Sequence, residues 1–266
     1  MTGLDAARVE RWLAAVSERR SRRSFTGERP DTLVLSELED VARAFRPFGE
    51  LSRAVVIRDA PPGLFMGIVG SYGGVSGAPC ALAFVGPAED MRSRAAVGYT
   101  GEGLVLEATA LGLDTCWVGG LFSGAAAEQL AGVAPDERVF AVAAVGTAAE
   151  RVTAKERIIF KSGRPRRRKP IEEIAPGFQR WPAWAQRGLE AARIAPSATN
   201  RQPWRFFMHE GAVVVSVDGA DTPKISKRLD CGIAMLHFEL GARAAGCPGR
   251  WEFTDAPDVA RWVPTG

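Results

Sequence analysis

A pattern of helix, strand and glycine positions occurs twice along the 266 residues of this chain. The stretches 98–112 and 232–246 are both long and helical, and the helix and strand over 33–58 match those over 184–209. Equivalent positions share one offset: Gly98 with Gly232, Gly112 with Gly246, and Trp117 with Trp251. Such repetition indicates an internal duplication, and two tandem copies are expected to pack around a pseudo-two-fold axis.

The hydrophobic pattern mixes helical periodicity with short apolar runs, which is typical of an α+β protein. A glycine-rich segment over 63–79 interrupts it, and we expect a mobile loop there that gates a site. A polar, basic stretch over 147–170 connects the two halves. Helices are expected over 5–18, 31–45, 95–112, 181–195 and 228–246, and strands over 53–60, 80–86, 137–146 and 250–253, with a hairpin over 204–218 that turns at Glu210-Gly211.

Charge is nearly balanced, with 34 basic and 31 acidic residues and a formal net charge of +3. A dedicated nucleic-acid-binding protein usually carries a larger excess of lysine and arginine. The runs "RRSRRSF" (19–25) and "RPRRRKP" (164–170) are therefore local features, and we expect no nucleic-acid partner. A nucleic-acid-binding module that uses these runs is the weakest alternative.

The cysteine and histidine pattern does not favour a metal site. The four cysteines form no C-x-x-C pair and only two histidines occur, so no metal is expected. Scattered cysteines suit core positions in a reducing compartment. The amino-terminal stretch lacks the apolar core of a signal peptide, and no window reaches the ~20 apolar residues of a membrane span. We therefore expect a cytoplasmic protein with no membrane partner.

Hydrolytic and phosphate-loop motifs are missing. The sequence has no G-x-S-x-G, no Walker A motif and no G-x-G-x-x-G after a strand. The most informative polar stretch is "APSATNRQPWRF" (195–206), in which prolines bracket serine, asparagine and glutamine. Amide side chains both donate and accept hydrogen bonds, which suits a planar heterocycle. A plain turn rich in turn-forming residues is the alternative.

Together these segments resemble the FMN-dependent nitroreductase family, and most closely its single-chain members with a duplicated arrangement. The similarity covers most of the chain. Its segments are "RRSRRSF", which resembles the R-R-S-x-R-x-F opening, "APSATNRQPWRF", which is similar to A-P-S-x-x-N-x-Q-P-W-x-F, and "GAPCALAFV" (77–85), "GLVLEATALGLDTCWVGGLF" (103–122) and "RRKPIEEI" (167–174). The resemblance implies an α+β fold of two tandem repeats, each a mixed or antiparallel sheet flanked by helices.

The order of the motifs departs from that of ordinary members, which are dimers with flavin at the subunit interface. In those members the proline-serine-asparagine loop follows the arginine-serine opening closely, whereas here it lies in the second half of the chain. The equivalent stretch of the first half, "RPFGELSRAVV" (46–56), lacks the motif. We therefore expect a fused pseudo-dimer of halves 1–160 and 161–266, with one complete site and one degenerate site. The resemblance favours a monomer, and a weak dimer is the alternative.

Residue roles follow from positions within the family's motifs. The phosphate and ribityl chain of FMN would contact Arg19, Ser21 and Arg23, with Arg20 acting through its backbone or toward the pyrimidine ring and Arg166 and Arg168 closing on the phosphate. The isoalloxazine would be lined by Pro196, Ser197, Ala198, Asn200 and Gln202, and its N5 would face the backbone of Val118, Gly119 and Gly120. Gly119 stands where many relatives carry glutamate, which leaves substrate and nicotinamide positioning open.

No catalytic side chain is expected, because flavin carries the chemistry and the protein orients it. The resemblance implies an FMN-dependent oxidoreductase that passes hydride from NAD(P)H through flavin N5 to a nitroaromatic, quinone or similar acceptor. A flavin-binding carrier or sensor with little turnover is the alternative, because Gly119 replaces a glutamate and the second site has decayed.

Overall fold

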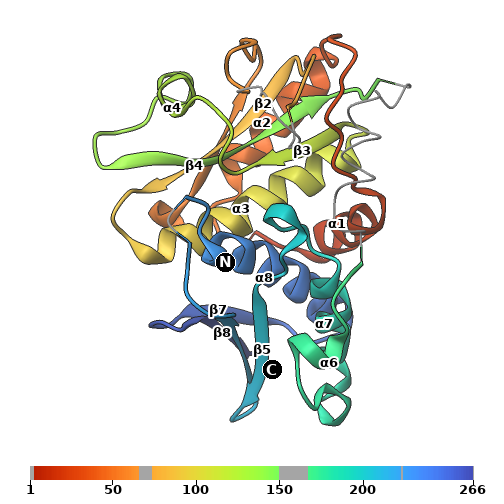
Figure 1. Cartoon of the computed structure of the whole chain (residues 1–266). Coiled ribbons are helices and arrows are strands. Elements are labelled where there is room, and N and C mark those ends of the chain that lie inside the picture. Colours follow the sequence, from red (N-terminus) through yellow and green to blue (C-terminus); the bar gives the residue numbers. More distant parts are fainter. Residues whose placement is uncertain (1–2, 66–73, 150–166, 223, 266) are drawn as a thin grey trace.

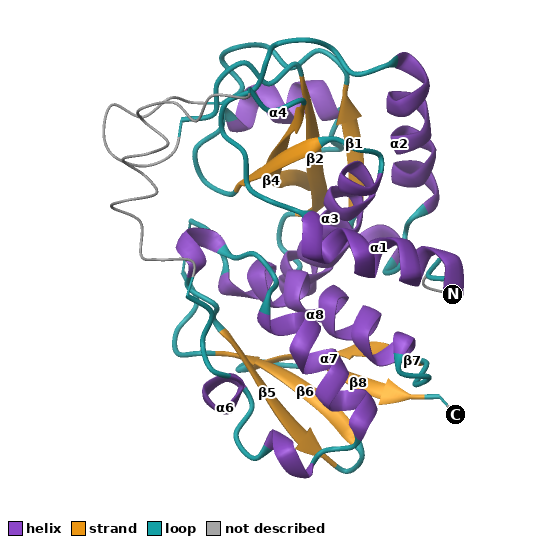
Figure 2. Cartoon of the chain, turned by 90° about the vertical axis from the view of Figure 1, so that its right-hand side faces the viewer, coloured by secondary structure: helices purple, strands orange, loops and turns teal. Residues whose placement is uncertain are grey.

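A computed structural model describes residues 3–65, 74–149, 167–222 and 224–265. In this part of the chain the strands form two four-stranded sheets. The sheets lie at opposite ends of the molecule, with a layer of helices between them (Figure 1; Figure 2). The expected boundary between residues 160 and 161, part of the glycine-rich segment and Arg166 lie outside the described residues.

The first repeat forms the upper sheet of Figure 1. Its strands pair antiparallel in the order β1-β2-β4-β3. One face of the sheet packs on α3, and α4 contributes Ala127 and Ala131 to a second apolar cluster that includes β2 and β4 residues. Its elements are α1 (Ala6–Glu18), α2 (Thr32–Ala44), β1 (Arg53–Ile57), β2 (Cys80–Pro87), α3 (Met91–Ala110), β3 (Asp114–Val118), α4 (Gly124–Ala131) and β4 (Glu137–Gly146).

The second repeat forms the lower sheet with the same connectivity. Its strands pair in the order β5-β6-β8-β7, and the register shift between Phe84 and Val85 of β2 recurs between Val215 and Ser216 of β6. Two repeats of one fold are therefore confirmed. The elements are α6 (Ile171–Ile174), α7 (Ala183–Arg193), β5 (Trp204–His209), β6 (Ala212–Val217), α8 (Lys227–Ala244), β7 (Gly249–Phe253) and β8 (Asp258–Pro264).

The long helices α3 and α8 cross at the glycines that the repeat pairs. A Cβ atom on Gly98 would lie 2.0 Å from the carbonyl oxygen of Leu229, and one on Gly232 would lie 1.9 Å from that of Ala95. The two contacts are reciprocal, because Ala95 and Leu229 stand three residues before the two glycines. Glycine is required at both positions for the backbones to approach so closely. Nearly every residue of both helices is buried.

The helices and strands expected from the sequence are all present. Helix α3 begins at Met91 rather than 95, because Asp90 caps its amino terminus by accepting a hydrogen bond from the backbone N–H of Arg92. The hairpin turns where expected, with positive φ angles of 49° at Glu210 and 76° at Gly211. Two consecutive positive φ angles are typical of the tight turns that join antiparallel strands.

Helices α4 and α6 and strands β3 and β8 were not expected from the sequence. The resemblance assigns the β3 residues to a loop after the long helix, and the structure shows a strand there. Cys80, Cys116 and Cys231 are buried as expected, and Cys247 is half-buried. Within the described residues, no helix combines the length and the apolar character that crossing a membrane requires.

Candidate functional site

The first basic run leaves α1 and crosses the end of the first sheet. Ser21 forms a parallel bridge with Thr115 of β3, and the backbone N–H of Arg22 donates to the Thr115 carbonyl oxygen at 2.9 Å. Further along, the N–H of Phe25 donates to the Ser76 carbonyl oxygen at 2.9 Å. The run is therefore held extended along β3, which leads directly into Val118 and the glycine pair that follows it.

Arg19 is buried at the start of this run, with 9% of its surface exposed. Its Nε lies 3.8 Å from Oε1 of Glu102 in α3, which is ion-pair distance but too long for a hydrogen bond. That Nε finds no hydrogen-bond partner among the described residues. A buried guanidinium nitrogen without a partner is costly, which marks this position as one that suits an additional acceptor.

Glu102 is a fully buried carboxylate that joins the two repeats. It accepts from Trp117 Nε1 at 2.7 Å, and its other oxygen lies 2.8 Å from Nε2 of His237 in α8. The Nδ1 of His237 bonds the carbonyl oxygen of Ala191 at 3.2 Å. Because a carbonyl oxygen only accepts, Nδ1 is the donor in that bond, and Nε2 faces the carboxylate of Glu102.

Arg168 brings the second basic run to the same place. Its Nη1 donates to the Ala195 carbonyl oxygen at 2.7 Å and to Asn200 Oδ1 at 3.1 Å. Burial and the positive charge of Arg19 lower the pKa of Arg168 to about 10. The positive charge of Arg19 thus acts on Arg168, although the two residues belong to different halves of the sequence.

The polar loop 195–202 folds tightly against residues 167–169. Gln202, which is 3% exposed, accepts from the Lys169 N–H at 2.8 Å, and its amide nitrogen donates to the Arg167 carbonyl oxygen at 3.3 Å. The Asn200 amide nitrogen donates to the same carbonyl at 3.3 Å. The loop has positive φ angles at Thr199, Asn200 and Gln202. Its amides therefore fasten the second basic run to the loop.

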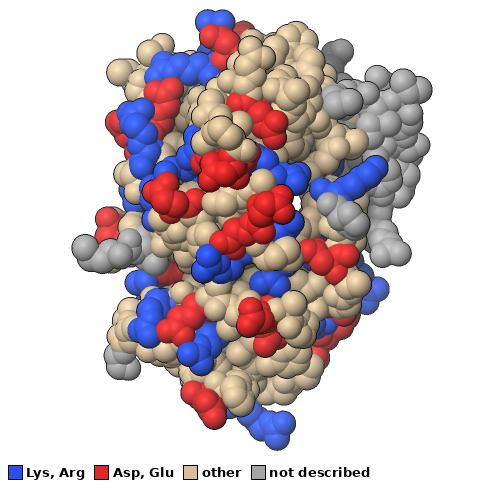
Figure 3. Space-filling model, turned by 90° about the vertical axis from the view of Figure 1, so that its left-hand side faces the viewer, with Lys and Arg blue, Asp and Glu red and all other residues tan. Residues whose placement is uncertain are grey.

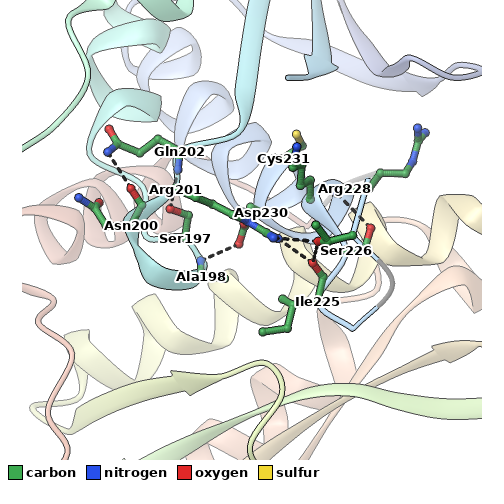
Figure 4. A network of polar contacts seen from close by, with 12 residues as sticks. Ser197, Ala198, Asn200, Arg201, Gln202, Ile225, Ser226, Arg228, Asp230 and Cys231 are labelled. Carbon is green, nitrogen blue, oxygen red and sulfur yellow. Dashed lines mark hydrogen bonds and ion pairs between the residues drawn. The ribbon is translucent and has the colours of Figure 1, made fainter. Parts of the chain in front are cut away.

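An ion pair anchors the other side of this loop (Figure 4). Arg201 Nε donates to Asp230 Oδ2 at 2.5 Å, and Asp230 Oδ1 accepts from the Ala198 N–H at 3.0 Å. Asp230 lies in the first turn of α8 and is 1% exposed. Burial raises the pKa of Asp230 to about 6, against the lowering effect of Arg201. Neither Arg201 nor Asp230 was expected at the site from the sequence.

The two repeats also meet at the glycine pair after β3. The side chain of Ile225, which immediately precedes the Ser226 cap of α8, faces Gly119 and Gly120. A Cβ atom would lie 3.1 Å from Ile225 on Gly119 and 3.0 Å from it on Gly120. The bare backbone of the first repeat is thus covered by one branched apolar side chain of the second.

The structure brings most of the sequence-predicted residues into one region. Segments 19–25, 118–120, 167–169 and 195–202 are linked through Glu102, Arg168 and Ile225. Arg20 is exposed and its guanidinium bonds the carbonyl oxygens of Ser17 and Arg19.

The roles of individual residues stay predictions. Sequence reasoning missed Glu102 and His237, which lie inside the largely buried helices α3 and α8. The available signal was a polar residue among apolar neighbours.

The fold defined by two such repeats is that of the nitroreductases. Residues 12–242 match the family described as "Putative TM nitroreductase", and the chain belongs to that family. No curated protein matches the chain.

Among solved structures, a nitroreductase from Thermotoga maritima is 21% identical, with a TM-score of 0.60 over 95% of this chain and 93% of its own. A nitroreductase family protein from Clostridium difficile is 21% identical, with a TM-score of 0.43 over 62% of this chain and 95% of its own. A nitroreductase with bound FMN from Bacteroides fragilis is 18% identical, with a TM-score of 0.43 over 53% of this chain and 90% of its own.

Proposed function

We propose that the chain binds FMN between its two repeats and acts as an oxidoreductase that takes electrons from NAD(P)H. The observation that carries this proposal is Arg19, a buried guanidinium whose Nε has no hydrogen-bond partner among the described residues, while Arg168 adds a second positive charge from the other half of the chain. A buried cation is costly unless an anion offsets it, and Glu102 at 3.8 Å makes no hydrogen bond to that Nε. A phosphate supplies that charge and matches the forked geometry of arginine.

The residues present fit this cofactor. Arg19 Nε lacks a hydrogen-bond partner among the described residues and would donate to a phosphate oxygen. Ser21 is half-buried on the adjacent extended run and offers a hydroxyl. Glu102, which is fully buried beside Arg19, offsets part of the positive charge. It would therefore lower the affinity of the site for anions that make no other contacts.

The segment Val118–Gly120 would face the ring system. Gly119 and Gly120 have no side chains of their own to shield their backbone N–H groups, and a donor there would stabilise negative charge on the reduced ring. Bound FMN supplies the hydride chemistry, and the protein supplies binding, orientation and electrostatics. The loop 195–202 would close the opposite side of the pocket, held by Gln202 and by Arg201.

We further propose one such site per chain and a monomer that functions as a pseudo-dimer. The stretch of the first repeat that corresponds to the loop 195–202 is the short 3₁₀ turn Gly49–Leu51 with its flanks. That stretch has none of the serine, asparagine and glutamine pattern of the loop, so the mirror-related site is not expected to bind flavin. Native mass together with flavin stoichiometry tests this, and two FMN per chain would contradict it.

The proposed site is tested by flavin titration. The purified protein should take up FMN, and NADH or NADPH should bleach the bound flavin in the absence of air. Arg168→Ala should weaken FMN binding at least tenfold, because it removes a charge-assisted phosphate contact worth roughly 1.5–3 kcal/mol. Arg187→Ala is the matched control, since Arg187 is an exposed arginine of α7 paired only with Glu190 in the described residues. Equal FMN affinity for both variants would overturn the assignment.

A flavin carrier or sensor with little turnover is the second candidate. It is favoured by Ile225, which covers the glycine pair where an acceptor would approach. Steady-state oxidation of NADPH with a quinone separates the two, since a carrier binds FMN without turnover.

Figure 3 shows acidic and basic side chains interspersed on one face of the molecule, and no extended basic surface for nucleic acid is seen among the residues drawn in colour. Cys80 and Cys231 are buried free thiols, which supports our proposal that the protein works in a reducing cytoplasm.

A further inference from the structure

Ile225 occupies the space that a side chain on residue 119 would need. Its Cγ2 lies 3.1 Å from the Cβ position of Gly119, and its Cδ1 lies 3.0 Å from that of Gly120. Contacts this short leave no room for a larger residue at either glycine unless Ile225 moves. The cover over the glycine pair is therefore built by the second repeat, from a residue far away in the sequence.

Arg201 holds the backbone that carries Ile225. Its Nη2 donates to the Ile225 carbonyl oxygen at 2.8 Å and its Nη1 to Thr222 Oγ1 at 2.9 Å, while its Nε is fixed by Asp230 at 2.5 Å (Figure 4). The guanidinium thus joins three points: the loop 195–202, the first turn of α8 and the segment before it. A rigid planar fork with several donors suits this role, which a lysine cannot reproduce.

The segment is also braced from within. Ser226 Oγ donates to Asp221 Oδ2 at 2.6 Å, and the backbone N–H of Lys227 bonds the other oxygen of that carboxylate. Ile225 is half-buried, so part of it stays exposed although it contacts the glycine pair. A half-buried apolar group fixed at its backbone forms a wall whose size and position are both defined.

We propose that Ile225 determines which acceptors reach the flavin and that Arg201 is the positioning residue that sets its place. The proposal rests on the proposed function and names the substrate class of the same site: compact, single-ring acceptors. An isoleucine offers no hydrogen bond, so it discriminates by volume alone. Removing a few carbons from such a wall changes selectivity between ligands of different size by roughly 10–200-fold.

The first test compares two acceptors of different width. With FMN and NADPH, Ile225→Ala should raise the ratio of kcat/KM for 1,4-naphthoquinone over 1,4-benzoquinone by about tenfold or more. Leu130→Ala is the control, because Leu130 is a 42% exposed apolar residue of α4. Arg201→Lys removes nothing from the wall, yet it should shift the ratio in the same direction as Ile225→Ala. An unchanged ratio in Ile225→Ala with normal FMN occupancy would overturn the proposal.

The second test needs no flavin, so its failure is distinct from failure of the proposed function. Gly119→Leu should lower the thermal midpoint of the purified protein, because the new side chain collides with Ile225. In the Ile225→Ala background, Gly119→Leu should lower the thermal midpoint by clearly less. Equal costs of Gly119→Leu in both backgrounds would show that Ile225 does not fill that space, whether or not the protein binds FMN.

Discussion

The crossing of α3 and α8 offers a sharp test of the packing between the repeats. In Gly232→Ala the added methyl would lie 1.9 Å from the carbonyl oxygen of Ala95. A carbon and a carbonyl oxygen normally stay about 3.3 Å apart, so the helices must separate by about 1.4 Å at this point. Both helices are nearly fully buried, and neither can yield without disturbing the core.

The expected change in the free energy of unfolding of Gly232→Ala is the sum of a favourable and an unfavourable contribution. Gly→Ala within a helix gains roughly 1 kcal/mol from helix propensity. Overpacking costs typically 1–3 kcal/mol, and a gap of about 1 Å opened elsewhere along the crossing forfeits up to about half of the dispersion energy of the contacts affected. Overpacking less the gain in propensity leaves a loss of up to about 2 kcal/mol, and the forfeited dispersion energy adds to it, so the free energy of unfolding should fall by about 2 kcal/mol or more. FMN affinity should fall as well, since the proposed site lies between the repeats.

Urea denaturation of wild type, Gly232→Ala and Gly124→Ala measures the loss in the free energy of unfolding. Gly124 is the matched control, because it opens α4 and a Cβ there meets no atom within 4 Å. Adding Gly98→Ala to Gly232→Ala should cost less than the sum of the two single changes, since one separation of the helices relieves both collisions. Stability of Gly232→Ala within about 0.5 kcal/mol of wild type would refute the reasoning, because surface substitutions already span that range.

Two further expectations concern buried polar groups. Burial raises the pKa of Asp230 to about 6 from 3.8, so its contribution to stability is fully present below pH 3.8 and lost as pH rises through 6. Relative to Asp230→Asn, wild type should therefore be more stable at pH 4 than at pH 7 by on the order of 3 kcal/mol in urea titrations, and a pH-independent difference would count against it. Trp117→Phe keeps an aromatic ring beside Phe84 but removes a donor from buried Glu102, so thermal unfolding should show a loss of about 1–3 kcal/mol, and no loss would mean that water replaces the indole.

The duplicated sequence pattern predicted much of the fold because it is carried by backbone requirements. Gly98 and Gly232 are forced by the helix crossing, and the Glu210-Gly211 turn by its positive φ angles. Strand β3 was missed because "DTCWV" is short and follows the long helix after a turn, so its periodicity has no room to show. Strand β8 was missed because Arg261 interrupts its apolar residues, so the sequence there resembles a polar tail. In the structure, β8 pairs with β7.

For the candidate site, sequence predicted the segments better than the contacts. The sequence motifs proposed Arg19, Ser21 and the glycine pair as one site, and the structure holds the arginine-serine run along β3, the strand that ends just before the glycines. The partners that join these segments could not be predicted, because α3 and α8 each carry two acidic residues and nothing along the chain distinguishes Glu102 or Asp230 from the other one. Their importance comes from burial and from neighbours supplied by the other repeat, and neither is visible along the chain.

The Glu102–His237 pair shows what joining two repeats in one chain allows. At the offset that relates Gly98 to Gly232, the counterparts of these two residues are Leu236 and Gly103. An acid and a base thus meet across the axis on one side, while leucine and glycine occupy the corresponding places on the other. A dimer of identical subunits carries any such pair twice, once at each of the two equivalent positions of its interface. A single chain with two repeats is free of that constraint. One of the two positions can then keep residues for chemistry, while the other keeps residues that only pack.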